Sequence, residues 1–195
     1  MNKRQIRNRP QAGFSYIEVM IALVILLVGV LGLTSALSAN LIRSYESEKR
    51  IVAKQTALST IESIISARDI KRTGAVEGWD TVGNIGTNPV AGVNQGIFLT
   101  GFNPIREDLG WDGVGGTADD ACAGSGSCTV NGKTNASRVI PGFERQIVIT
   151  DVADPDRPSP PAAIARRRIE ITVRYNVNQL TRDEVSATIV TNYSN

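Results

Sequence analysis

The residue types that could do chemistry are few, and some are absent altogether. The 195-residue chain contains no histidine, which excludes Ser-His-Asp and Cys-His catalysis, histidine-ligated metal sites and a histidine pH switch. The two cysteines, Cys122 and Cys128, are too few for a structural zinc site. Five small residues separate them, so their sulfur atoms can meet in one disulfide; two free buried thiols are the alternative. Redox catalysis is not expected, because the spacing is not C-x-x-C and no basic residue adjoins either cysteine.

An acidic, glycine-rich loop is the second candidate. Asp112, Asp119 and Asp120 bring three carboxylates onto a flexible backbone, and such oxygen ligands suit Ca²⁺. The loop lacks the EF-hand spacing and its distal glutamate, and acidic turns are commonly just solvated. We therefore predict no metal and no other cofactor, with calcium at this loop as the alternative. The same glycines loosely imitate G-x-G-x-x-G, but no strand precedes them, which argues against nucleotide binding.

A basic run at Arg166, Arg167 and Arg168 is the third candidate. The run favours the solvated end of a strand, and contact with DNA or another anionic surface is the less favoured alternative. The sequence contains no grouping of nucleophile, base and orienting residue, so we predict that the protein is not an enzyme.

The strongest pattern lies at the N-terminus. Residues 1–13 contain no acid and four basic residues, which are Lys3, Arg4, Arg7 and Arg9. Residues 14–42 contain a single charge, Glu18, and residues 19–42 contain none. This uncharged stretch would form about 36 Å of helix, enough to cross a hydrocarbon core of about 30 Å. The basic residues before it predict that the N-terminus stays cytoplasmic and that most of the chain lies across the membrane.

A cleaved signal peptide or a plain signal anchor is the alternative for this segment. Residues 35–39 (SALSA) could serve as a signal peptidase site. The apolar segment is, however, longer than the apolar region of about 7–15 residues in a signal peptide, and it carries an acid near its start. A charge at the centre of a membrane costs roughly 2.5–3.5 kcal/mol, and charges of that cost commonly have a function.

The sequence Gly13-Phe14-Ser15-Tyr16-Ile17-Glu18-Val19, between a basic leader and a long apolar helix, resembles the class III signal of type IV prepilins and type II secretion pseudopilins. The resemblance implies that a membrane prepilin peptidase cuts between Gly13 and Phe14, and that Phe14 is then N-methylated. Glycine leaves a protease groove unobstructed. Glu18 would be the fifth mature residue, where the cationic N-terminus of a neighbouring subunit can neutralise it. The apolar residues that follow are similar to the PilV class of minor pilins.

One departure from the family concerns proline. Major pilins commonly carry a helix-breaking proline in the apolar segment, whereas residues 14–42 contain none. Gly29 and Gly32 can supply flexibility instead. Together with Ala36 and Ala39 they share one helix face, which a neighbouring helix could approach closely. The alternative is that small residues are simply common in membrane helices.

The helix is expected to continue beyond the apolar segment and to become amphipathic. Apolar residues recur at helical spacing among charged ones over residues 43–72. Lys71, Arg72 and Gly74 have the character of a helix end. One helix over residues 14–72 is therefore predicted, and its second half needs a partner surface.

Three alternating segments near the C-terminus predict that partner surface. They cover residues 143–152, 168–175 and 184–193 and are rich in β-branched residues. In the second segment the alternation places four side chains on one face, namely Ile169, Ile171, Val173 and Tyr175. The segments predict an antiparallel meander with one face on the helix. A further short strand is expected around residues 96–102.

These elements predict an α+β protein with a long N-terminal helix packed on a C-terminal antiparallel β-sheet, which is the type IV pilin-like fold that the resemblance also implies. Residues 1–13 would form the leader, residues 14–42 the transmembrane and assembly half of the helix, and residues 43–72 its amphipathic half. A Gly-rich variable loop region with the disulfide would cover residues 73–142, and the sheet residues 143–195.

The function implied by the resemblance is that of a minor pilin, a structural subunit incorporated into a type IV pilus or priming its assembly. A minor pseudopilin of a type II secretion system is the alternative. The implied partners are prepilin peptidase, the major pilin, other minor pilins, the inner-membrane assembly platform and, before assembly, membrane lipid; nucleic acid is not expected. The implied location is the bacterial inner membrane, with a periplasmic head, and then the pilus at the cell surface. An exported head favours the disulfide, because that compartment is oxidising.

The charge balance depends on this processing. The whole chain has 21 Lys and Arg against 19 Asp and Glu, a formal net charge of +2. Removing residues 1–13 leaves 17 basic residues against the same 19 acids, a net charge of −2. The mature head is therefore expected to be slightly acidic.

Overall fold

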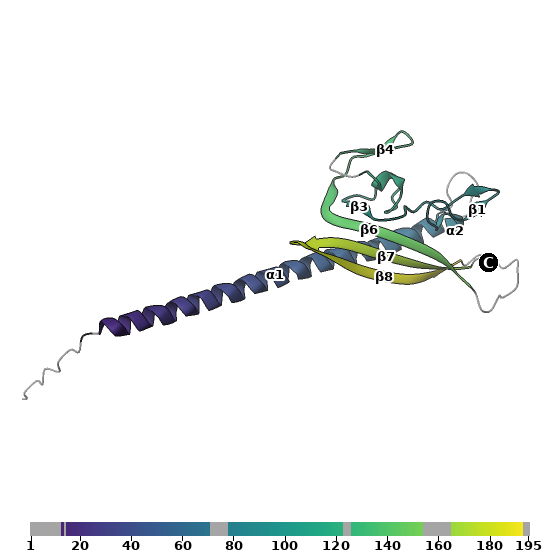
Figure 1. Ribbon diagram of the computed structural model, residues 1–195. Coiled ribbons are helices and arrows are strands. Elements are labelled where there is room, and N and C mark those ends of the chain that lie inside the picture. Colours follow the sequence, from purple (N-terminus) through teal and green to yellow (C-terminus); the bar gives the residue numbers. More distant parts are fainter. Residues whose placement is uncertain (1–12, 14, 71–77, 123–125, 154–164, 193–195) are drawn as a thin grey trace, which may run out of the picture. The chain divides into compact units, whose positions relative to one another are not determined.

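The computed structural model describes residues 13, 15–70, 78–122, 126–153 and 165–192. A long helix comes first, then a segment of short elements, and then the long strands (Figure 1). The chain divides into two compact units, Met1–Tyr45 and Glu46–Asn195, and the boundary between them falls inside the long helix.

Helix α1 extends over Tyr16–Asp69, close to the helix predicted over residues 14–72. Lys71, Arg72 and Gly74, the predicted end, lie outside the described residues. In the second unit the helix is one-sided, and the residues that it buries are mostly small: Ala53, Ala57, Thr60, Ser63, Ile64 and Ala67. Small side chains at the contact reduce the distance between the helix and the surface it packs on.

A four-stranded antiparallel sheet forms the partner surface, in the order β3-β6-β7-β8. The strands are β3 (Asn103–Arg106), β6 (Val139–Val152), β7 (Arg166–Val177) and β8 (Leu180–Thr191). The three predicted strands are present as β6, β7 and β8, each with shifted or extended ends. The predicted α+β fold class is confirmed.

The fourth strand is not where the sequence predicted a short strand. Residues 96–102 contain no strand, and Phe98 forms only an isolated bridge with Asn84. The backbone of Phe98 pairs instead with loop residues, donating to the Gly83 carbonyl at 3.0 Å and accepting from the Ile85 amide at 2.8 Å. These bonds pair the predicted segment with the loop that contains Asn84, and β3 is the strand that pairs with β6 instead.

The core lies between α1 and one face of the sheet (Figure 1). The alternation in β7 was predicted correctly: Ile169, Ile171 and Val173 are fully buried and Tyr175 is almost so. From the helix side, Ala57 and Ile64 belong to the same core cluster. The apolar alternation of one strand and the small face of the helix therefore account for how the two elements pack.

Short elements fill the chain between α1 and β6. They are α2 (Gly78–Thr81), β1 (Pro89–Val90), β2 (Val93–Asn94), the 3-10 helix Ala118–Asp120, β4 (Cys128–Val130) and β5 (Lys133–Asn135). The pairs β1-β2 and β4-β5 are antiparallel hairpins outside the main sheet. The region predicted to be rich in loops thus also contributes β3 and the first residues of β6 to the sheet.

The side chain of Asn84 pairs with backbone groups of β6 that lie beyond the end of β3. Its Nδ2 donates to the Ile147 carbonyl at 2.8 Å, and its Oδ1 accepts from the Ile149 amide at 2.9 Å. Both backbone groups are thereby paired by one amide side chain, as a neighbouring strand would pair them. This edge of the sheet is protected without a longer strand.

Candidate functional site

The expected cleavage site lies just before α1. Gly13 is exposed, and a Cβ added there would meet no atom within 4 Å. Packing within the described chain therefore gives no reason for a glycine at this position, and cleavage after Gly13 stays a prediction. Phe14, the residue expected to be methylated, and leader residues 1–12 lie outside the described residues.

Glu18 caps the first turn of α1. Its Oε2 accepts a hydrogen bond from the Ser15 backbone amide at 3.1 Å, and the Glu18 and Val19 amides donate to the Ser15 carbonyl. Ser15 is thus the N-cap residue and Glu18 makes the reciprocal contact of a capping box. A carboxylate at this end of a helix also interacts favourably with the helix dipole. Glu18 therefore has a structural role in capping α1, and any test of its role in assembly must distinguish the two.

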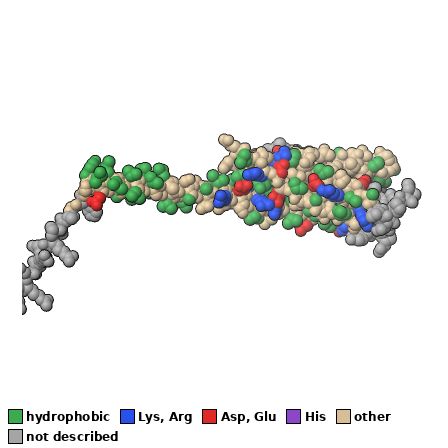
Figure 2. Space-filling view, turned by 60° about the horizontal axis from the view of Figure 1, so that its bottom comes forward, with side chains coloured by type: hydrophobic (Ala, Val, Ile, Leu, Met, Phe, Trp, Pro, Cys, Tyr) green, Lys and Arg blue, Asp and Glu red, His purple; other side chains and the backbone are tan. Residues whose placement is uncertain are grey.

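The first unit contains the apolar part of α1, and its described residues are exposed. Its most apolar 18-residue window has a mean hydropathy of 2.7, and 0% of that window is buried. Figure 2 shows hydrophobic side chains along this part of the helix. A helix that is apolar all round requires a membrane or other helices around it. Its exposure distinguishes it from the core helix of a soluble domain, and its length and composition fit a membrane-spanning segment.

The small residues of this helix remain a predicted packing face. Gly29, Gly32, Ala36 and Ala39 are all exposed and lie within an arc of about 80° of the helix surface. A Cβ added at either glycine would meet no atom within 4 Å. The described chain itself thus places nothing against this face.

Cys122 and Cys128 form a disulfide, with their Cα atoms 5.3 Å apart. Arg106, which no sequence pattern marks, holds the surrounding loop. It is 5% exposed, and its guanidinium donates to the carbonyls of Cys122 at 2.8 Å, of Gly126 at 3.1 Å and of Ser137. The disulfide loop is therefore tied to β3 by a buried cation as well as by its covalent bond.

The acidic loop uses its carboxylates as hydrogen-bond acceptors. Asp112 accepts from the Val114 amide and from the Thr117 hydroxyl, each at 2.8 Å. Asp119 lies 2.7 Å from the same hydroxyl, whose single proton the two carboxylates share, and it accepts from the Trp111 amide at 3.0 Å. These bonds give the acids a role in loop structure. Among the described residues, no group of three or more Cys, Asp or Glu side chains is arranged to hold a metal ion.

Asp120 and Arg145 form a buried ion pair. The Asp120 Oδ2 accepts from the Arg145 Nη2 at 3.1 Å and from the Gly116 amide at 2.6 Å, while the Arg145 Nη1 donates to the Thr60 hydroxyl at 3.1 Å. Arg145 is 5% exposed. Burial raises the pKa of Asp120, and the Gly116 amide and Arg145 oppose that shift. The pair joins the acidic loop to β6 and to α1.

The basic run is not a uniformly solvated strand end, so that prediction was wrong for its middle residue. Arg167 is buried, and its guanidinium lies over the Trp79 ring, 4.3 Å from the centroid. It donates to the carbonyls of Trp79 and Val82 and pairs with Asp151 at 3.0 Å. The cation is paired inside the protein because residues 79–82 and strand β6 both contact it. Its side chain is therefore not presented to DNA or another anionic surface.

These observations first define the class of protein. It is an α+β protein whose long N-terminal helix begins with an apolar segment that fits a membrane anchor. Residues 8–34 match the family described as the prokaryotic N-terminal methylation motif. The match and the apolar helix support a type IV pilin-like protein, either a pilin or a pseudopilin. Proteins with this motif are structural subunits that prepilin peptidase processes and that assemble with other pilins. No curated protein and no solved structure matches the chain.

Proposed function

We propose that the chain is a minor pilin of the PilV class, incorporated into a type IV pilus or priming its assembly after cleavage at Gly13 and N-methylation of Phe14. The observation that carries the proposal is the match over residues 8–34, which extends into α1 from Tyr16 onward, where the most apolar 18-residue window of the helix is 0% buried. Before assembly this helix would lie in the inner membrane with its N-terminus cytoplasmic and the head periplasmic. In the filament, sister helices would replace lipid around it.

Two apolar residues in the second half of α1 support a bundle of such helices. Ile51 and Leu58 are 54% and 57% exposed, in contrast to Ala57 and Ile64, which face the sheet. Residues seven apart lie on the same side of a helix. The apolar contact with neighbouring subunits can therefore continue beyond the membrane segment, along the side of α1 that faces away from the core.

Glu18 would guide docking by pairing with the cationic N-terminus of the adjacent subunit. Two variants separate this role from capping. In Glu18→Gln the side-chain oxygen still accepts from the Ser15 amide but the charge is lost, whereas Glu18→Ala loses both. We expect both variants to be cleaved, and both to be at least about tenfold depleted from sheared filaments relative to the membrane fraction. Normal incorporation of Glu18→Gln would show that capping alone matters.

The same motif is shared with minor pseudopilins, so a role in type II secretion is the second candidate. A subunit of a surface pilus and a subunit of a periplasmic secretion filament differ in the process that depends on them. Deletion of the gene should abolish twitching and leave exoprotein release intact if the pilus assignment is right. Loss of exoprotein release with normal twitching would support the secretion system instead.

A further inference from the structure

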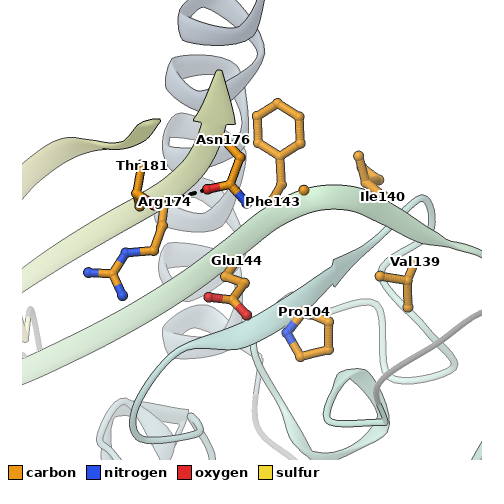
Figure 3. A pocket seen from close by; sticks show the side chains of 9 residues that line it. Pro104, Val139, Ile140, Phe143, Glu144, Arg174, Asn176 and Thr181 are labelled. Carbon is orange, nitrogen blue, oxygen red and sulfur yellow. Dashed lines mark hydrogen bonds between the residues drawn. The ribbon is translucent and has the colours of Figure 1, made fainter. Parts of the chain in front are cut away.

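A hollow opens on the face of the sheet that points away from α1, in the second unit. Its volume is about 490 Å³, and its lining includes Pro104, Val139, Ile140, Glu144 and Arg174. Asn176 and Thr181 complete one side, where the Thr181 hydroxyl donates to the Asn176 Oδ1 at 3.2 Å. Figure 3 shows the Glu144 side chain between Arg174 on one side and Pro104 on the other. Four strands therefore contribute to one concave site.

An irregularity in strand pairing makes room for the hollow. Pro104 pairs with Glu144, but Arg106 pairs with Val139, so one residue of β3 spans four residues of β6. Gly142, within the displaced stretch, has a φ of 76°, a conformation that favours glycine. Bulges of this kind are more frequent beside functional sites than elsewhere in sheets, because they redirect side chains and open the surface.

The two charged side chains that line the hollow, Glu144 and Arg174, differ in their hydrogen bonds. Glu144, Arg174 and Asp183 lie in one row across the sheet. The Arg174 guanidinium makes two hydrogen bonds to Asp183, at 2.9 and 3.1 Å, and lies over the Phe102 ring at 3.7 Å. Glu144 is exposed and forms no hydrogen bond or ion pair with another residue of the described chain. Arg174 acts on Glu144 only through its charge and gives its hydrogen bonds to Asp183, so the charged group in the hollow that lacks a hydrogen-bonded partner is a carboxylate.

The rest of the lining suits an aliphatic stem. Pro104, Val139 and Ile140 are half-buried and apolar, and they lie on the side of Glu144 opposite Arg174 (Figure 3). Lys and Arg side chains combine an apolar stem with a charged head, so they can cover apolar surface while the head pairs with a carboxylate. An anion would instead meet Glu144 unfavourably and find Arg174 already paired.

We propose that this hollow binds a basic side chain, lysine or arginine, from a neighbouring subunit, with Glu144 receiving the cation and Pro104, Val139 and Ile140 contacting its stem. That the basic side chain belongs to a neighbouring subunit rests on the proposed function. That the hollow binds a basic side chain rests only on the residues that line it. Charge complementarity thus makes the hollow an interaction site distinct from α1.

The binding chemistry can be tested on the full chain in detergent micelles with n-butylguanidinium as the probe. Incorporation of 4-fluorophenylalanine gives built-in ¹⁹F reporters: Phe143 lines the hollow, Phe102 lies over Arg174, and Phe98 is a core residue that does not line it. Resonances are assigned with single Phe→Tyr variants. The probe should shift the Phe143 or Phe102 resonance in a saturable way and leave Phe98 unchanged.

Glu144→Gln should raise the apparent dissociation constant of the probe about two- to fivefold, the size expected for a partly exposed ion pair. Glu170→Gln is the matched control, because Glu170 lies on the same sheet face outside the hollow and should leave the constant unchanged. No saturable shift, an equal effect of the two substitutions, or an equal response to n-butanol or n-pentanoate would overturn the proposal.

The identity of the partner needs a second readout. Glu144→Lys should be depleted from sheared filaments at least severalfold relative to Glu170→Lys, while both variants are cleaved normally. Normal recovery of Glu144→Lys would overturn the assignment to a neighbouring subunit. Whether or not Glu144→Lys is depleted, normal cleavage and N-methylation would still support the proposed pilin function. Failure of the subunit assignment can therefore be distinguished from failure of the proposed function.

Discussion

Replacing Arg145 by methionine tests the buried ion pair that joins the acidic loop to the core. The substitution keeps an unbranched apolar stem but removes the donor to Asp120 and to the Thr60 hydroxyl. Asp120 is 2% exposed, so its carboxylate would be left buried without a counter-charge. Removing one partner of a buried pair costs about 3–5 kcal/mol. In a unit of this size, each kcal/mol lowers Tm by about 2–4 °C, so we expect a fall of roughly 6–20 °C.

The assay is thermal unfolding of the full chain in detergent, followed by tryptophan fluorescence. Arg174→Met is the matched control, because Arg174 is also paired with an aspartate but is more exposed, and should cost no more than about 1 kcal/mol. Arg145→Met combined with Asp120→Asn should be more stable than Arg145→Met alone, since the unpaired charge is gone. A loss below about 1 kcal/mol for Arg145→Met, or no recovery in the double variant, would refute the reasoning.

Two further predictions concern the disulfide and acid stability. Replacing Cys122 and Cys128 by serine should lower the free energy of unfolding by about 2 kcal/mol in the same assay, as expected for a short closed loop, and reductant should then have no further effect. The hydrogen bonds from Arg174 lower the pKa of Asp183, so this carboxylate contributes stability that is present above its unfolded pKa of about 3.9 and is lost as pH falls through the lower folded value. The difference in Tm between the parent chain and Asp183→Asn should therefore shrink between pH 6 and pH 2.5, and a constant difference would contradict the assigned cause.

The long elements could be predicted because their patterns are local. The uncharged residues 19–42 predicted the apolar half of α1, and the strict alternation around Ile171 predicted both β7 and its buried face. Strand β3 was missed because it has only four residues and includes Pro104, which cannot donate to a ladder. Its pairing depends on residues of β6 that lie 33–42 positions later in the chain, and not on its own pattern.

The buried cations could not be predicted for the same reason. Arg106, Arg145 and Arg167 resemble surface residues in the sequence, since arginine is rarely buried without partners. Each donates hydrogen bonds to groups from other segments of the chain, such as the Trp79 carbonyl for Arg167, although the Arg106 Nε is buried without a partner among the described residues. Asn84 is similar, because its amide pairs with backbone groups of β6 more than sixty residues away. No local signal marks such positions.

The central claim is that the chain is processed as a prepilin, and the N-terminus of the mature protein tests it most directly. Mass spectrometry of the protein purified from membranes or filaments of its native host should find N-methylated Phe14 as the first residue. The same protein from cells that lack prepilin peptidase should retain residues 1–13. A mature chain from normal cells that still begins at Met1, or one that begins near Asn40 as signal peptidase would leave it, would contradict the account.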